Sequence, residues 1–377
     1  MSGTRIARVE VLPLVLPFRG EFRISRGVIG ATDRGRTVAL VKVTADDGTV
    51  GWGEASPIPV WSPEPLHSVV GAIRDHLGPA VIGRPVDALD GLHRAMHEAI
   101  APGFGAGMPI AKAGIDIAVH DLLGKIRGLP LWALLGYRRA TTVTLSWTVG
   151  APDLDSARRS IEEGRQRGYR HFNVKVGHDV HHDVALCEMV RKVAPDSVLW
   201  GDANGGIPPH RAAAHARALE AAGLDLLEQP VRADAIGTWR ELRQRVEIPI
   251  VVDETVTGPG PLMELIRADA VSGVALKVTR TGGIFPSRQC AEIAMAAGLL
   301  LVSSGLTDAG VALAANVHLA AAFGVELPCA LNGPQFLADD VLALPLAIEG
   351  DVVTVPDGPG LGSVVDEEKV RHYAVSL

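Results

Sequence analysis

The chain has few cysteines, no excess of positive charge and no long apolar run. Its three cysteines, Cys187, Cys290 and Cys329, are far apart and form no CxxC pair, which favours reduced, packed thiols over disulfides or a thiolate metal site. A formal net charge of −7 indicates no basic surface for nucleic acid. No apolar stretch reaches membrane-spanning length. These absences point away from disulfide-rich, nucleic-acid-binding and membrane proteins.

The remaining composition is that of an ordinary globular protein. Of the 377 residues, 47% are hydrophobic and 21% are charged. A chain of this length exceeds the size at which one hydrophobic core stops growing, so two domains are expected. The N-terminal segment MSGTRIARVEVLPLVLPF lacks a sustained apolar region and a small-residue cleavage site, and it predicts a strand rather than a signal peptide. We expect a cytoplasmic protein.

The first third of the chain predicts an α+β domain. Residues 4–60 alternate apolar and polar side chains in short runs, and Asp47-Gly48 lies between two such runs, as in an antiparallel hairpin. From Ser62 onward the apolar period becomes helical, most clearly in IAKAGIDIAVHDLLGKIRG. We therefore expect a first domain at residues 1–136.

From about Thr141 to Pro334 the pattern becomes strand, turn and helix, repeated. Ala-rich amphipathic helices such as PHRAAAHARALEAAG separate most of the strand candidates. Parallel strands that alternate with such helices form a sheet covered on both faces or closed into a barrel, and the number of candidates favours a (β/α) barrel of the TIM type. The eight strand candidates are TVTLSWTV, HFNVKVG, VLWGDAN, LDLLEQP, PIVVDET, GVALKV, LLLVSSG and PCALNGP.

The rest of the chain, from Ala338 onward, contains short strand-like pieces such as IEGDVVTVPD. We expect these pieces to return to the first domain and complete it. The predicted fold class is therefore α/β, with a (β/α) TIM-type barrel at residues 137–337 inserted between an N-terminal α+β domain and a C-terminal segment at residues 338–377.

Acidic and basic residues follow five of the apolar stretches, at the point where each stretch ends. They recur at intervals of about 25 residues, the length of one strand, one turn and one helix. Because a barrel places the carboxyl ends of its strands around one mouth, we expect all five side chains to converge there. These residues are Lys175, Asp202, Glu228, Asp253 and Lys277.

The three carboxylates of this set would repel one another and raise their own pKa values if no cation lay among them. Asp202, Glu228 and Asp253 offer only oxygen ligands, which suit a hard cation such as Mg²⁺, with Mn²⁺ as an alternative. Lys175 and Lys277 are then free to act as acid and base, because burial and a nearby cation weaken the hold of a lysine on its proton. In the alternative interpretation, both lysines are only counter-ions of the carboxylates.

Four features together resemble the enolase superfamily, and within it the mandelate racemase/muconate lactonizing enzyme group, with the muconate lactonizing subgroup as the closest match. They are the three acidic strand ends, the Lys277 strand followed by Gly282-Gly283, the segment AKAGIDIAVHDLLGKIRGLPLWALLG and the terminal PGLG. The resemblance covers nearly the whole chain.

The resemblance implies Mg²⁺ on the three carboxylates and removal of a proton α to a substrate carboxylate, which gives an enolate stabilised by the metal. It implies that the two lysines form the acid/base pair, one on each face of the substrate. It also implies that the N-terminal α+β domain caps the barrel mouth, with the loops at residues 20–30 and 56–62 near the distal part of the substrate.

Two departures from the subgroup's pattern bear on the reaction and the substrate. Asn173 stands where the subgroup has the first lysine of Lys-x-Lys on the second barrel strand. Without that neighbouring charge, Lys175 should hold its proton more tightly and act mainly as an acid, with Lys277 as the base; alternatively the replacement is neutral. On the eighth strand, Asn332 stands in LNG where dipeptide epimerases carry Asp-x-Asp, which disfavours an unsubstituted dipeptide substrate.

Several polar residues near strand ends are candidates for substrate contacts, although an Asn before Gly is also typical of a turn. The candidates are Asn173, Asn204, Ser304, Asp308 and Asn332, with Ser303 beside them. The acidic and histidine-rich run at residues 178–183 is better explained as a solvated first helical turn than as a transition-metal site. Arg23 and Arg26 could meet a substrate carboxylate, but exposed arginines are common.

We therefore predict a Mg²⁺-dependent isomerase that racemises, epimerises or cycloisomerises a small carboxylic acid, working as a homo-oligomer without nucleic-acid or membrane partners. A dehydratase is the nearest rival, because β-elimination of water from a hydroxy acid needs the same enolate and a general acid. A Schiff-base aldolase also carries a lysine at a barrel strand end, and a metal-binding protein without activity is a third alternative. The sequence does not identify the substrate.

Overall fold

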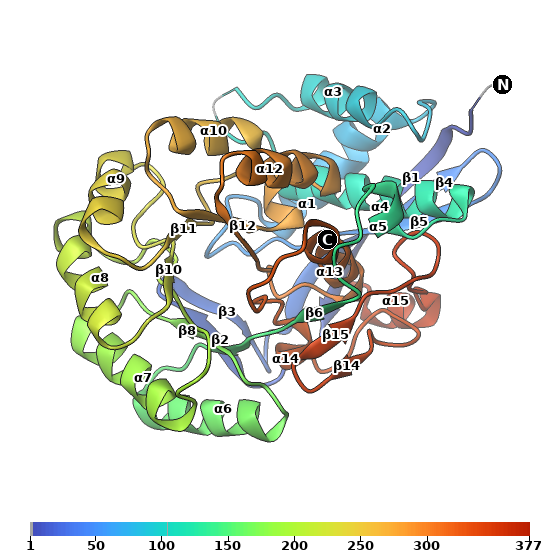
Figure 1. Ribbon diagram of the computed structural model, residues 1–377. Coiled ribbons are helices and arrows are strands. Elements are labelled where there is room, and N and C mark those ends of the chain that lie inside the picture. Colours follow the sequence, from blue (N-terminus) through green and yellow to red (C-terminus); the bar gives the residue numbers. More distant parts are fainter. Residues whose placement is uncertain (1–2, 104) are drawn as a thin grey trace.

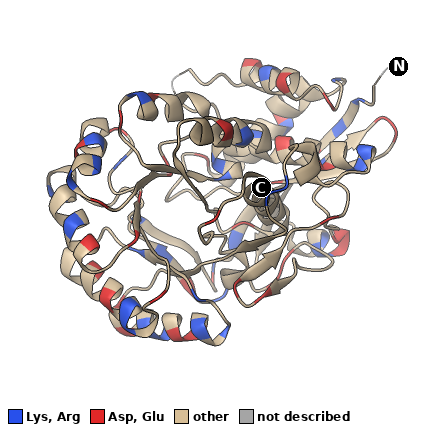
Figure 2. Cartoon of the chain, viewed as in Figure 1, with Lys and Arg blue, Asp and Glu red and all other residues tan. Residues whose placement is uncertain are grey.

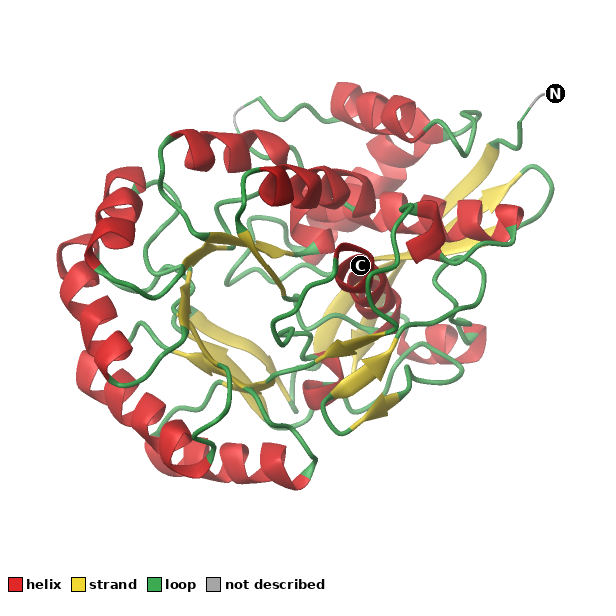
Figure 3. Ribbon diagram, in the orientation of Figure 1, coloured by secondary structure: helices red, strands yellow, loops and turns green. Residues whose placement is uncertain are grey.

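The computed structural model describes residues 3–103 and 105–377 of the chain. Strands curl into a ring with helices along its outside, and an α+β domain lies against this ring (Figures 1 and 3). Figure 2 shows charged residues of both signs along the outer helices. Within the described residues, no helix combines the length and the apolar character needed to cross a membrane.

The N-terminal domain is built on an antiparallel sheet in the order β1-β4-β5, with a separate β2–β3 hairpin. The predicted turn at Asp47-Gly48 joins β4 to β5, and Gly48 has the positive φ of +85° that only glycine adopts readily. Helix α4 can lie directly on β5 because a Cβ at Gly53 would overlap the main chain of Gly114. The elements are β1 (Ile6–Leu16), β2 (Glu21–Ile24), β3 (Gly27–Ala31), β4 (Arg36–Ala45), β5 (Val50–Ala55), α1 (Leu66–Ala72), the π-helical turn η1 (Ile73–Leu77), α2 (Gly78–Val81), α3 (Leu89–Ala99), α4 (Pro109–Arg127) and α5 (Leu131–Leu134).

The middle of the chain forms one parallel sheet of seven strands, in the order β13-β12-β11-β10-β9-β8-β7. Parallel strands buried on both faces read as continuous apolar runs, which is why these strands could be located in the sequence. The strands are β7 (Trp147–Val149), β8 (Phe172–Lys175), β9 (Leu199–Asp202), β10 (Leu226–Glu228), β11 (Ile250–Val252), β12 (Gly273–Leu276) and β13 (Leu300–Ser303). The helices are α6 (Leu154–Gln166), α7 (Val180–Val193), the 3₁₀ turn η2 (Pro209–Arg211), α8 (Ala212–Ala221), α9 (Ile236–Arg245), α10 (Pro259–Arg267), α11 (Val278–Thr281), α12 (Ile284–Ala296), α13 (Gly310–Phe323) and α14 (Gly333–Phe336).

The first and last strand candidates differ from the prediction in detail. The first divides into β6 (Thr142–Thr144), which pairs with the C-terminal segment, and β7, which joins the barrel sheet. The last, PCALNGP, forms no regular strand and closes the barrel through two single bridges, Leu145 to Cys329 and Ser304 to Ala330. Prolines at both ends of this segment cannot donate hydrogen bonds, which limits its pairing. The architecture is nevertheless the predicted TIM-type barrel.

The last part of the C-terminal segment returns to the first domain, as predicted. IEGDVVTVPD does not: it forms a hairpin whose second strand pairs with β6 at the start of the barrel part. Leu14 of β1 forms a bridge with Ala374, and Lys42 of β4 pairs with Glu367 at 2.7 Å. The elements of this segment are β14 (Ile348–Glu349), β15 (Val352–Thr354) and α15 (Glu367–Tyr373). The first domain is thus completed by residues from the far end of the chain.

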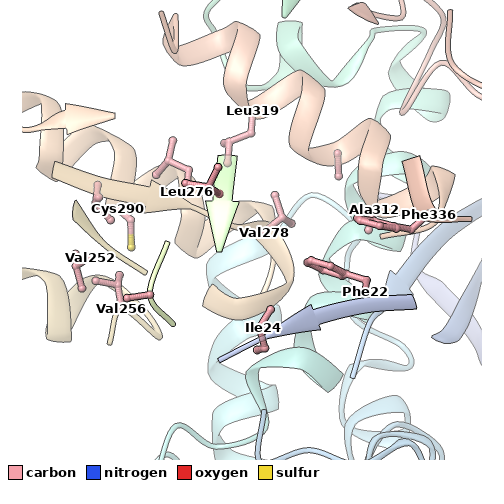
Figure 4. Close-up of a cluster of buried hydrophobic side chains, with 14 of the residues drawn as sticks. Phe22, Ile24, Val252, Val256, Leu276, Val278, Cys290, Ala312, Leu319 and Phe336 are labelled. Carbon is pink, nitrogen blue, oxygen red and sulfur yellow. The ribbon is translucent and has the colours of Figure 1, made fainter. Parts of the chain in front are cut away.

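Apolar contacts hold the first domain on the barrel. Figure 4 shows Phe22 and Ile24 of β2 in one cluster with Val278 and Phe336 of the barrel part. Phe22 stacks on Phe336, with ring centroids 4.4 Å apart and an interplanar angle of 15°. Stacked aromatic pairs stabilise such an interface beyond the area that they bury. The first domain therefore packs against the barrel through this hairpin, in agreement with a capping role.

Candidate active site at the barrel mouth

The five charged residues singled out in the sequence lie at the carboxyl ends of five neighbouring strands. Lys175, Asp202 and Glu228 are the last residues of β8, β9 and β10, and they are direct neighbours in the register of the sheet. Asp253 and Lys277 directly follow β11 and β12. All five side chains are buried. The parallel sheet thus brings them to one end of the barrel.

These side chains form the layer above the apolar floor of the barrel. Side chains on one face of a strand recur every second residue. The barrel interior holds an apolar cluster of Trp200, Leu226, Val251, Ala275, Val302 and Ala330. Two residues further along each segment stand Asp202, Glu228, Asp253, Lys277, Ser304 and Asn332. The same period therefore places Ser304 and Asn332 next to the charged residues.

Each lysine is hydrogen-bonded to an aspartate of the set. Lys175 Nζ donates to Asp202 Oδ2 at 2.5 Å, and Lys277 Nζ donates to Asp253 Oδ2 at 2.6 Å. Arg280 donates to the other oxygen of Asp253 and to the main chain of Ala275. Sequence reasoning missed Arg280, which lies three residues after Lys277 in the turn of α11.

The charged residues at the barrel mouth carry more negative charge than the hydrogen bonds from lysine and arginine balance. Glu228 Oε1 is buried and has no hydrogen-bond partner among the described residues. Burial and the negative charge of Asp202 raise the pKa of Glu228 to about 8. Burial and Asp202 also raise the pKa of Glu254, which follows Asp253 in the chain. Sequence reasoning missed Glu254, although the acidic pair in PIVVDET was the available signal.

The donor set fits a hard divalent cation. It offers only carboxylate oxygens, one of them unpartnered, and repulsion raises the pKa of Glu228, which a cation would relieve. Within residues 3–103 and 105–377, no three His, Cys, Asp or Glu side chains already stand close enough together to hold a metal ion. In this arrangement Asp202 is paired with Lys175, and Asp253 is paired with Lys277 and Arg280.

Asn204 links two of the acidic groups. Its side-chain Nδ2 donates to Asp202 Oδ2 at 3.1 Å and to Glu254 Oε1 at 3.0 Å, and its main-chain N–H donates to Asp202 Oδ1 at 2.9 Å. Asn204 also has a positive φ of 45°. Of the candidates for substrate contact, this one is engaged in holding carboxylates in place.

Asn173 is fully buried on β8, two residues before Lys175. Neither Nδ2 nor Oδ1 of its amide has a hydrogen-bond partner among the described residues, and Trp200 Nε1 on the next strand also lacks one. A buried amide without partners is unfavourable, so such groups usually face water or a ligand. Asn173 is therefore the candidate with the strongest structural support for a contact to substrate.

The remaining candidates differ in how much of each side chain is free. Ser304 Oγ is buried without a partner in the described chain, and Asn332 has one free atom, Oδ1, while its Nδ2 donates to Thr148 Oγ1 at 3.3 Å. Asp308 Oδ2 accepts hydrogen bonds from Leu306 N and from Asn316 of α13, each at 3.1 Å. Asp308 thus anchors the loop that enters α13, with only Oδ1 left over.

The capping domain supplies two aromatic side chains to the lysines. The Trp61 ring lies 4.2 Å from Lys277 Nζ, and its Nε1 donates to Glu254 Oε1 at 2.5 Å. The Phe22 ring lies 5.8 Å from Lys175 Nζ. Trp61, Glu254 and Lys277 line a cavity of about 90 Å³. Trp61 belongs to the loop expected near the substrate, but its contact with a lysine could not be read from the sequence.

The hairpin loop at residues 20–30 is tied to the turn that follows β9. Ser25 Oγ donates to Ala203 O and Arg26 Nε donates to Asn204 O, both at 2.9 Å. These bonds connect the capping domain to the segment that carries Asp202. Arg26 is thus engaged with the main chain, which the sequence alone did not indicate.

The acidic and histidine-rich run at residues 178–183 was expected to form a solvated first helical turn, and this expectation is only partly right. Asp179 caps the first turn of α7, as predicted for this segment. Asp183, however, is fully buried and not solvated: it accepts a hydrogen bond from Gly177 N at 2.7 Å and is bonded to His215 at 2.9 Å. A buried carboxylate that binds main-chain N–H groups fixes the loop after β8.

Comparison with known proteins matches both parts of this architecture. The family model described as mandelate racemase / muconate lactonizing enzyme, N-terminal domain, matches residues 15–136. The model described as enolase C-terminal domain-like matches residues 156–369. Together these matches cover most of the chain.

The proteins that this chain resembles over nearly its full length include isomerases. The chain is 31% identical to muconate cycloisomerase 1-1 of Acinetobacter lwoffii, with 99% of this chain and 97% of that one covered. It is 28% identical to N-succinyl-L-Arg/Lys racemase of Bacillus cereus, with 98% of each covered. The crystal structure of muconate lactonizing enzyme from Pseudomonas fluorescens, complexed with muconolactone, has a TM-score of 0.92 at 26% identity and covers 99% of this chain and 100% of that one. The chain therefore belongs to the mandelate racemase/muconate lactonizing enzyme group of the enolase superfamily, as an enzyme of the isomerase type.

Proposed function

We propose that the chain catalyses the Mg²⁺-dependent removal of a proton α to a carboxylate and the return of a proton, giving racemisation, epimerisation or cycloisomerisation of a small carboxylic acid. The observation that carries this proposal is the position of two buried lysines. Lys175 ends β8 and Lys277 follows β12, and the three strands between them end in Asp202, Glu228 and Asp253. When bound, Mg²⁺ supplies positive charge that stabilises the negative charge developing on the substrate carboxylate.

The lysines carry the proton steps. The neutral amine of one lysine takes the proton from the α-carbon, and the electron pair of the C–H bond moves into the carboxylate to give an enolate. In a racemisation, the ammonium of the other lysine delivers a proton to the opposite face. In a cycloisomerisation, one lysine protonates the enolate that ring closure produces. Each lysine lies beside one of the proposed metal ligands, Lys175 next to Asp202 and Lys277 next to Asp253, so both amines lie at the proposed metal site.

The unpartnered polar groups support a role in substrate recognition. Asn173 offers both a donor and an acceptor, while Ser304 and Asn332 each offer one free oxygen. We keep Asn204 and Asp308 as weaker candidates, because most of their hydrogen bonds are already made within the protein. The relatives' names suggest two substrate classes to test first: muconate-like diacids and N-succinyl amino acids. The expected cytoplasmic location and homo-oligomer stay predictions.

The proposal is tested by proton exchange. The full-length protein is incubated in D₂O with a library of carboxylic acids, including N-acyl amino acids, and α-deuteration is followed by NMR. We expect exchange that disappears with EDTA and returns with Mg²⁺, and that survives the control substitution Lys192→Ala on the exposed face of α7. If activity persists in EDTA and borohydride traps a covalent adduct of substrate and protein, Schiff-base chemistry would replace the proposal. Release of water with formation of a 2-keto acid would indicate β-elimination instead.

A further inference from the structure

A second cavity lies in the seam between the capping domain and the barrel, next to the cavity that Trp61 and Lys277 line, with which it shares Ala106, Pro109 and Thr257. Its volume is about 370 Å³. One wall comes from α3 and the start of α4, and the other from the segments that lead into α10 and α12; in Figure 1, α3 lies above α12 in the view. The cavity is lined by basic side chains on the capping side and by Thr257, Gly282 and Phe285 on the barrel side.

Lys112 is the buried charge in this seam. Only 2% of the residue is exposed, and within the described residues it forms no ion pair with a carboxylate. Its Nζ donates to Ile100 O at 2.7 Å, which uses one of its three donors. Both oxygens of Glu64, the carboxylate whose charge acts on Lys112, accept main-chain hydrogen bonds from Ile110 and Ala111 at 3.0 Å.

Buried charges in proteins are usually paired directly, whereas Glu64 acts on Lys112 only from beyond ion-pair distance. Burial lowers the pKa of Lys112 to about 8, although the negative charge of Glu64 opposes the shift. Lys112 therefore remains mostly protonated at neutral pH. Two donors of its Nζ have no partner among the described residues, and Lys112 lines the cavity, so an anion held there would pair with it directly.

Arg94 on the same wall carries a second positive charge. His97 donates from Nδ1 to His93 O, and burial lowers its pKa, so its Nε2 is a hydrogen-bond acceptor and offers nothing to an anion. Asp90 is the one acidic residue among the described lining, and its carboxylate is taken by Arg94 at 2.5 Å. His93 is held by Asp116 at 2.6 Å. The wall thus presents the charges of Lys112 and Arg94, and the one carboxylate in the described lining is already paired with Arg94.

We propose that this seam is a binding site for a small anion, a carboxylate or a phosphate, with Lys112 as its buried charge partner. The five charged residues of the barrel mouth do not line this cavity. Because its two walls belong to the capping domain and the barrel, a bound anion holds the two together and stabilises the docked arrangement. The site is independent of the reaction proposed above, and its failure would leave that proposal unchanged.

Calorimetric titration of the full-length protein tests this site with two probes, succinate and inorganic phosphate, in a low-salt buffer. We expect saturable binding of at least one probe, weakened about tenfold or more in Lys112→Met, and a higher thermal midpoint of the native protein in its presence. Binding should be unchanged in Lys192→Met, an exposed lysine on α7, and in Lys277→Met at the mouth. The tighter probe identifies the anion class.

Three results would overturn the proposal: no saturable binding, equal affinity in Lys112→Met, or loss of binding only in Lys277→Met, which would place the anion at the mouth. Circular dichroism checks that Lys112→Met is folded. If it is not, Arg94→Gln on the same wall serves as the second variant, with several-fold weaker binding expected and unchanged affinity counting against the site.

Discussion

At the scale of single residues, the chemistry of this protein depends on charges that the fold leaves unbalanced. Glu228 is the clearest case, because the pKa of its buried carboxyl is raised to about 8 by burial and by Asp202, while one of its oxygens has no partner in the described chain. Asp253, in contrast, already contacts Lys277 and Arg280. A substitution at Glu228 therefore isolates the metal-binding role more cleanly than one at Asp253.

We expect Glu228→Gln to weaken Mg²⁺ binding at least about tenfold and to abolish α-proton exchange, because it removes a charged oxygen ligand and keeps the shape of the side chain. Calorimetry with Mg²⁺ measures the affinity. The control is Asp90→Asn on the exposed face of α3, which should bind Mg²⁺ as the native protein does. Unchanged affinity in Glu228→Gln would remove Glu228 from the metal site.

The two lysines are expected to act on opposite faces of the substrate carbon, since three strands separate β8 from β12. Lys175→Ala and Lys277→Ala should each lose exchange by a factor of about 100 or more for the enantiomer whose proton faces the missing lysine. Some exchange of the other enantiomer should persist. NMR in D₂O with each pure enantiomer separates the cases. Equal residual exchange of both enantiomers in both variants would contradict opposed faces.

Asn173 offers a test of local charge at the second barrel strand. In Asn173→Lys, two ammonium groups would share one strand face, and at an effective dielectric of about 20 their repulsion amounts to roughly 2 to 3 kcal/mol. This repulsion favours the neutral amine of Lys175, so the basic limb of the pH profile of exchange should move to lower pH in the variant. Asn173→Leu, which adds no charge, is the control. If both variants shift alike, substrate shape and not charge explains the position.

At the scale of elements, carboxylates of the capping domain bind the open ends of helices. The first N–H groups of a helix lack partners within the helix, and a carboxylate placed there satisfies them. Glu54 accepts hydrogen bonds from Ala309 N at 2.8 Å and Ala312 N at 3.0 Å, at the start of α13. Asp116 does the same for Ile284 N at the start of α12. Both contacts cross from the capping domain to the barrel.

Asp116 makes the stability of this junction dependent on pH. Burial alone would raise the pKa of Asp116, but the charges and hydrogen bonds of His120 and His93 outweigh it and hold the pKa well below its usual range. A carboxyl with a depressed pKa stabilises the fold above its unfolded value of about 4, and this stabilisation is lost as the pH falls through the folded value.

We therefore expect Asp116→Asn to lower the free energy of unfolding by about 3 kcal/mol or more at pH 7, because it leaves buried histidines without their partner. Below about pH 4 the difference between the two proteins should shrink. Urea unfolding at several pH values measures this, with Asp90→Asn as the exposed control. A constant difference from pH 7 to pH 3 would show that the charge of Asp116 contributes nothing.

At the scale of the whole molecule, the sequence predicted those features of the fold and the site that depend on local, repeating patterns. Lys175 and Asp202 could be placed because apolar runs and their ends recur with the period of a barrel. The stacking of Trp61 on Lys277 and the capping of α12 by Asp116 could not be predicted, because each joins segments more than a hundred residues apart that no local period relates. The weak pairing of PCALNGP also depends on tertiary context, since its bridge partners, Leu145 and Ser304, come from two segments far apart in the chain.

The return of the C-terminal segment to β1 has a consequence for how the protein is made. β1 is an edge strand of its sheet, and the bridge from Leu14 to Ala374 joins two residues that the whole barrel separates in the chain. Until Ala374 has been synthesised, this edge of β1 stays open, and open edges of this kind pair with foreign strands. The N-terminal sheet therefore lacks its final neighbour for as long as the barrel between these two residues is being made.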